Sequence, residues 1–191
     1  MYRQVFSLAA IALTFIAFFP YIRSILQGKT KPHVFSWVLW GTTTFIVFLA
    51  QLADEGGVGA WPIGVSGIIT VYVALLAYLK KSDSSITRSD CAFFIIAMSA
   101  IPFWYLSNDP LWAVVILTSV DVIGFGPTIR KAYCYPFEEQ LTFFVLMAMR
   151  NLFVIIALEN LSVTTILFPA LTGLVCMVFI VIVIFRRRAL A

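Results

Sequence analysis

Two proline-containing segments, 107 residues apart, place the strongest constraint on what this chain can form. Pro20 follows a long apolar run and so does Pro127, while Pro62 and Pro169 keep the same spacing. A chain of 191 residues that repeats itself over more than half its length is expected to consist of two similar halves. In membrane proteins, such repeats are typical of transporters whose site lies between the halves.

Composition places the chain in a membrane. Hydrophobic residues make up 62% and charged residues 12%, with a mean hydropathy of +1.00, whereas soluble domains are nearer half apolar and a quarter charged. The first apolar run ends with Pro20 and Arg23 and has no signal-peptidase site, so we expect it to be retained. The net charge of +4 reflects basic residues that flank apolar segments, and we expect no nucleic-acid partner. Three cysteines and one histidine show no metal-ligand spacing, so no metal or other cofactor is expected.

Seven apolar segments approach the roughly 20 residues that a spanning helix needs, and each is predicted to form a transmembrane helix. They cover residues 5–25, 34–53, 59–79, 91–106, 111–133, 141–158 and 163–185. In this topology 11 of the 13 basic residues fall on one side: Arg23, Lys29, Lys31, Lys80, Lys81, Arg88, Arg130, Lys131, Arg186, Arg187 and Arg188. Because basic loops stay in the cytoplasm, we predict the N-terminus outside and the C-terminus in the cytoplasm. The compact loops are typical of a bacterial inner (plasma) membrane protein.

The proline spacing relates the first helix to the fifth, the second to the sixth, and the third to the seventh. The fourth helix has no counterpart and is predicted to be a linker. One linker helix between two three-helix units lets both units face the same way, about an axis along the membrane normal. The predicted fold class is therefore an all-α membrane protein with a 3+1+3 arrangement, made of a bundle over 1–81, a linker over 82–109 and a bundle over 110–191.

The motifs at the two prolines resemble those of the PQ-loop and SWEET-like (MtN3) transporter superfamily. The first match is Pro20-Tyr21-Ile22-Arg23, followed by Gly28-Lys29-Thr30-Lys31 and Ser36-Trp37. The second is Asp121-Val122-Ile123-Gly124-Phe125-Gly126-Pro127-Thr128, followed by Thr142. Tyr21 and Thr128 stand in place of the glutamine of each motif. The resemblance covers nearly the whole chain, and it implies two parallel three-helix bundles that move a sugar or an amino acid, or bind a ligand as the KDEL receptor does.

Two charges, Asp121 and Arg150, lie inside predicted helices. Each is about ten residues from a membrane surface, or roughly 15 Å deep at 1.5 Å per residue. A charge near the midplane costs on the order of 3 kcal/mol, so each is expected to face a partner or a water-filled cavity. In a functional interpretation Asp121 binds a proton or a substrate ammonium, and Arg150 binds a substrate carboxylate or controls the protonation of Asp121. The alternative is a structural ion pair between the fifth and sixth helices.

The remaining candidates are residues that can line a central cavity and prolines that can act as hinges. The first set is Asn151, Trp40, Trp61, Ser66 and Thr70, and the second is Pro20, Pro127, Pro62 and Pro169. A proline inside a membrane helix frees a backbone carbonyl, and breaks at matching places in two repeats point to a site between them. Each set also has a structural interpretation, namely interhelix packing for the first and helix shape or a first-turn position for the second.

These features predict a secondary transporter or facilitator that moves a small polar solute, amino-acid-like or sugar, through a midplane cavity by alternating access, with or without protons. The alternative is a seven-helix receptor or scaffold that binds a ligand without transporting it. An enzyme is not expected, because the chain shows no Ser-His-Asp set, P-loop or Gly-rich nucleotide loop. The run Arg186-Arg187-Arg188 is expected to contact anionic lipid, and the sequence leaves open whether the protein forms a homo-oligomer.

Overall fold

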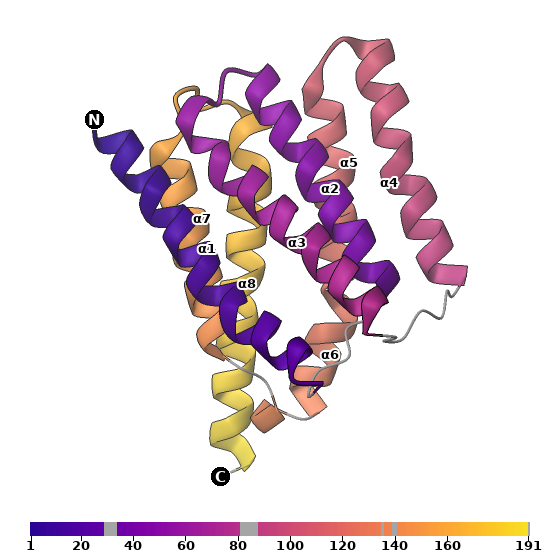
Figure 1. Cartoon of the computed structure of the whole chain (residues 1–191), viewed down its shortest axis with the longest axis vertical. Helices are drawn as coiled ribbons and strands as arrows, with labels where there is room; N and C mark the ends of the chain where they lie inside the picture. The colour runs from indigo at the N-terminus through magenta and orange to yellow at the C-terminus, as the bar shows by residue number, and fades with distance from the viewer. Residues whose placement is uncertain (29–33, 81–87, 135, 139–140, 191) are drawn as a thin grey trace.

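The computed structural model describes residues 1–28, 34–80, 88–134, 136–138 and 141–190, and all regular structure in these ranges is helical (Figure 1). The α-helices are α1 (Tyr2–Leu26), α2 (Val34–Ala53), α3 (Trp61–Leu79), α4 (Arg88–Ser107), α5 (Pro110–Gly124), α6 (Gly126–Cys134), α7 (Leu141–Ala157) and α8 (Val163–Leu190). Two short 3-10 helices, η1 (Gly57–Gly59) and η2 (Pro136–Glu138), lie in the connections. Lys29, Lys31 and Lys81, which contribute to the predicted topology, lie outside the described residues.

The helices have the length and composition of an integral membrane protein. Four segments are long and apolar enough to cross a membrane, namely Tyr2–Leu26, Val34–Ala53, Gly57–Leu79 and Val163–Leu190, and shorter apolar helices cover Cys91–Ser107, Pro110–Gly124 and Leu141–Ala157. Large apolar side chains such as Phe15, Ile68 and Phe185 are more than half exposed on the outer surface, where lipid would cover them. The two termini lie at opposite ends of the bundle, and we call the end with the N-terminus the upper end and the other the lower end (Figure 1).

Six of the seven predicted segments coincide with single helices, but the prediction of one continuous fifth helix over 111–133 is wrong. The chain breaks at Phe125 into α5 and α6. Pro127 has no N–H to donate to the carbonyl of Ile123, and the glycines at 124 and 126 are poor helix formers. The N–H of Phe125 instead donates to Val122 at 3.2 Å, in a tighter turn. Apolar content alone does not reveal such a break.

The other three prolines of the repeat behave differently from Pro127. Pro20 lies inside α1 and Pro169 inside α8, and both helices continue through the proline. Pro62 occupies the first turn of α3, where a missing N–H breaks no helical hydrogen bond. The four matched prolines therefore do not interrupt the chain in the same way.

Six helices pack into a closed ring. Around it, α1 packs against α3 and α7, α2 packs against α3 and α5, and α8 packs against α5 and α7. The fourth helix, α4, packs on α5 and α2 at the edge of the bundle, and α6 continues from α5 to pack against α8 (Figure 1). The ring thereby brings residues that are far apart in sequence into one shared interior.

Candidate functional site

The buried part of the bundle contains polar side chains from every helix of the ring. They are Ser7, Thr14, Thr43, Thr44, Gln51, Ser66, Thr70, Thr118, Asp121, Arg150, Asn151, Thr164 and Thr165. Three hydroxyls of this set donate within their own helix, namely Thr14 to the carbonyl of Ala10 at 2.8 Å, Thr43 to that of Trp40 at 3.0 Å and Thr70 to that of Ser66 at 2.8 Å. The two charged members cannot be satisfied in that way, so their surroundings decide what this interior can do.

Asp121 lies at the interface between α5 and α2. Its side chain is 6% exposed, and Thr43 of α2 donates a hydrogen bond of 3.0 Å to its Oδ1. Trp40 belongs to the same interface, because a Cβ built on Gly124 would lie 3.5 Å from its indole Nε1. The predicted candidates Asp121 and Trp40 therefore lie on facing helices, and Trp40 is level with Gly124, one turn after Asp121 on α5.

Arg150 is the more deeply buried charge, at 2% exposed. Its Nη1 donates to Oδ1 of Asn151 at 3.0 Å, and its Nη2 donates to the backbone carbonyl of Pro62 on α3 at 3.1 Å. Its Nε has no hydrogen-bond partner. Asn151 in turn lies against α8, since a Cβ added at Gly173 would be 3.3 Å from the Cβ of Asn151. The guanidinium thus joins α7 to α3 through neutral acceptors only.

Asp121 and Arg150 are bound by different groups. Among the residues that the structure describes, no ion pair joins them, and α8 packs between their helices α5 and α7. The structural ion pair considered from the sequence is therefore not the arrangement seen here. A charge held at this depth by neutral groups is costly and is expected to serve a ligand, a proton or a water-filled cavity.

The remaining predicted substrate residues lie in three kinds of surroundings. Ser66 and Thr70 are buried one turn apart on α3, and the Thr70 hydroxyl donates to the Ser66 carbonyl at 2.8 Å. Asn151 is buried beside Arg150. Trp61 is 54% exposed and packs against Phe48 at 5.4 Å between ring centroids, so it lies on the outer surface of the bundle and not in the interior.

The upper end of the bundle is closed by contacts between two loops, the α2–α3 connection and the α7–α8 connection. The N–H of Glu159 donates to the carbonyl of Gly56 at 3.1 Å, and the N–H of Val58 donates to Oε1 of Glu159 at 3.4 Å. Asn160 donates to the carbonyl of Asp54 at 2.9 Å, and the Ser162 hydroxyl donates to the Asp54 carboxylate. We call these hydrogen bonds the upper loop contact. It ties the first half of the chain to the second.

A cluster of aromatic rings lies on the lower side of the buried polar residues. Trp37 stacks on Tyr21 at 5.0 Å between centroids and meets Trp40 edge-on at 5.7 Å. Phe18 meets Phe143 edge-on at 5.8 Å, which joins α1 to α7. On α1, Phe18 lies one turn below Thr14, and on α2, Trp40 lies one turn below Thr43, so in both helices the rings are on the side away from the upper loops. The polar interior thus lies between an aromatic layer and the upper loop contact.

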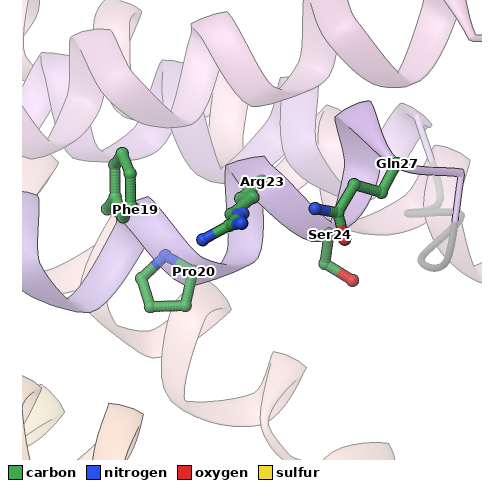
Figure 2. A pocket seen from close by; sticks show the side chains of 5 residues that line it. All are labelled: Phe19, Pro20, Arg23, Ser24 and Gln27. Carbon is green, nitrogen blue, oxygen red and sulfur yellow. The ribbon is translucent and has the colours of Figure 1, made fainter.

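A surface pocket of about 280 Å³ lies at the lower end of α1 (Figure 2). Its lining residues all come from the last turns of that helix and its C-cap, and they are Phe19, Pro20, Arg23, Ser24 and Gln27. Of the sequence candidates, only Pro20 belongs to it. The pocket is therefore a feature of the proline region of α1 and is separate from the buried charges.

Sequence reasoning missed Thr43 and Gln51, which are both fully buried on α2. They are eight residues apart, so they lie on the same face of the helix. Gln51 Nε2 donates to the carbonyl of Thr165 on α8 at 2.7 Å, while its Oε1 has no partner. Polar residues at helical spacing within an apolar segment were the available signal.

Comparisons of the chain with protein-family models, with curated proteins and with solved structures found no match.

Proposed function

We propose that this protein is a secondary transporter or facilitator that carries a small polar solute through the interior of its helix ring. The observation that carries the proposal is the pair of buried charges, Asp121 and Arg150, that neutral groups hold apart. If Asp121 and Arg150 had only a structural role, they would be expected to form an ion pair with each other, because a buried charge without a charged partner is strongly destabilising. Separated charges of opposite sign are instead suited to the two ends of a solute such as an amino acid.

The proposed architecture is the 3+1+3 arrangement, with α1 to α3 as one bundle, α4 as the linker and α5 to α8 as the other. The packing in the ring supports it, because α1–α3–α2 and α5–α8–α7 follow the same order. Opposite positions of the two termini agree with an odd number of membrane crossings (Figure 1). With the basic residues gathered at the lower end, we propose that this end faces the cytoplasm.

The proposed mechanism is alternating access, and the structure would correspond to a closed state. Support comes from the two layers that enclose the polar interior, the upper loop contact above and the aromatic cluster below. A few hydrogen bonds between short loops are a barrier that rocking of two bundles can break and remake. The break between α5 and α6 at Phe125 and the helical hydrogen bond that Pro20 cannot make inside α1 supply places where the bundles can flex. This mechanism, like the arrangement, fits the resemblance to the PQ-loop and SWEET-like superfamily.

A thermal-unfolding screen of the purified protein with amino acids and sugars tests the proposal. A solute that binds only the folded protein raises the melting temperature. We expect a stabilising solute whose effect is lost in Asp121→Asn or Arg150→Gln, and which wild-type protein moves across liposome membranes. Binding of that solute without flux would overturn transport and favour the receptor alternative.

A further inference from the structure

The pocket at the lower end of α1 opens away from the interior of the helix ring. The buried residues Thr14, Phe18 and Ile25 are four and seven positions apart, so they share the face of α1 that packs into the bundle. Pro20, which lines the pocket, lies about 200° round the helix from Phe18, at 100° per residue. The pocket therefore faces the surroundings of the bundle, which for an integral membrane protein are lipid.

The pocket is apolar on its upper side and polar on its lower side. Phe19 forms the upper side, and Ile16 lies one turn above it on the same face, where both side chains are more than half exposed. Arg23, Ser24 and Gln27 form the lower side, in the last turns of α1 and at its C-cap. Figure 2 shows the guanidinium of Arg23 pointing toward Pro20, so the positive charge lies at the boundary between the two sides. This order of groups matches a molecule with a polar head and an apolar tail.

The guanidinium of Arg23 is available for a ligand. Two other arginines at the lower end already have protein partners, since Nε of Arg186 donates to the carbonyl of Tyr133 at 3.0 Å and Nε of Arg187 donates to that of Pro136 at 2.9 Å. Arg23 is exposed, and within the described ranges of the chain no hydrogen bond or ion pair engages its side chain. A guanidinium presents a planar set of donors that fits a phosphate group.

The position of Arg23 along α1 corresponds to the level of lipid headgroups. The helix has 25 residues, more than the roughly 20 that cross the hydrocarbon core, and Arg23 lies in its last turn. At the same end of the bundle, Tyr78 in the last turn of α3 is 68% exposed, as residues of an interfacial aromatic belt are. A phosphate at this level belongs to a lipid, and the apolar tail of that lipid extends upward along α1.

We propose that this pocket binds an anionic phospholipid, with the phosphate on Arg23 and an acyl chain along Phe19 and Ile16. The volume of about 280 Å³ suits a headgroup, while the acyl chains lie outside it on the apolar face of the helix. The C-terminal pole of α1 by itself disfavours an anion, so phosphate binding depends on Arg23. The site lies on the outer surface of the bundle and is independent of the proposed function.

The test uses phosphatidylglycerol as the anionic lipid, phosphatidylcholine with the same acyl chains as its zwitterionic analogue, and sodium phosphate as the free anion. Each is titrated over the same concentrations against the full-length protein in a nonionic detergent. We expect phosphatidylglycerol to raise the melting temperature of the wild type and the other two to leave it unchanged. In Arg23→Gln the phosphatidylglycerol concentration for half of the effect should rise roughly tenfold or more, the size expected for lost hydrogen bonds to a charged group.

Two further variants separate the pocket from general attraction of anions. Lys80→Gln removes one positive charge from the lower end of α3, outside the pocket, and is expected to keep the wild-type response. Phe19→Ala keeps the charge but shortens the apolar side, so it is expected to need several times more phosphatidylglycerol.

The lipid site is overturned if Lys80→Gln loses as much of the response as Arg23→Gln, or if Phe19→Ala responds like the wild type. It is also overturned if phosphatidylcholine stabilises the protein equally, which would show an acyl-chain effect only, or if sodium phosphate alone reproduces the shift, which would show a site for a soluble anion. None of these results bears on solute binding in the interior, because Arg23 and Phe19 lie on the opposite face of α1.

Discussion

The side-chain amide of Gln51 donates a hydrogen bond of 2.7 Å to the backbone carbonyl of Thr165, four residues before Pro169. In an uninterrupted helix that carbonyl would accept from the N–H of residue 169, which a proline does not have. Gln51 therefore supplies from α2 the donor that α8 lacks. The contact also links the first half of the chain to the second, near the upper loop contact.

Gln51→Leu is predicted to destabilise the protein, because it leaves a buried carbonyl of α8 without a donor. The expected loss is about 1–2 kcal/mol, the range for hydrogen bonds between membrane helices. It is measured from reversible unfolding in mixed micelles. The matched control is the double variant Gln51→Leu with Pro169→Ala, in which residue 169 regains an N–H. This variant should recover most of the loss, and a double variant as unstable as the sum of the two single changes would contradict the role given to Gln51.

The close packing of α2 on α3 is predicted to tolerate no side chain at Gly41. A Cβ there would lie 2.7 Å from Cγ2 of Val71 and 3.0 Å from its backbone nitrogen, and a backbone atom cannot move aside cheaply. We expect Gly41→Ala to lower the unfolding free energy by about 1–3 kcal/mol, as overpacking does. In Gly124→Ala the new Cβ would meet only Trp40 at an ordinary 3.5 Å, so stability should be kept. Equal losses in both variants would show that the α2–α3 distance is not the cause.

The separation of Asp121 and Arg150 is tested by a double-mutant cycle on stability. Because the two residues bind different neutral partners, the effects of Asp121→Asn and Arg150→Gln are predicted to add within about 0.5 kcal/mol. Residues that share a buried ion pair would instead show a coupling energy well above that value. A large coupling in the unfolding free energy would restore the structural interpretation of the two charges.

The sequence predicted the helices well because the length of an apolar segment is itself the physical requirement for crossing a bilayer. Residues 34–53 were predicted as a helix and are α2. The burial of Asp121 and Arg150 also followed from the cost of a charge in lipid. The break at Phe125 did not, because apolar residues continue through it and only Gly124, Gly126 and Pro127 mark it.

The partners of the charged residues were not predictable, since these helices are apolar on nearly every side. In a soluble protein the polar face of a helix shows which side points outward, but lipid and protein interior both accept apolar residues. For this reason Trp61 was predicted to line a cavity and is instead exposed on the bundle surface. Thr43, which does face Asp121, is marked in the sequence only by its helical spacing to Gln51 within an apolar segment.

The most direct test of transport through the interior is solute flux with the upper loop contact locked. Asp54→Cys and Ser162→Cys would replace two side chains that touch across the two loops, in a protein whose native cysteines Cys91, Cys134 and Cys176 are replaced by serine or alanine. Uptake into liposomes of the solute identified by the unfolding screen is then measured after oxidation and again after reduction. We expect the cross-linked protein to stop carrying the solute and a reducing agent to restore uptake. Undiminished uptake by fully cross-linked protein would contradict alternating access through this interior.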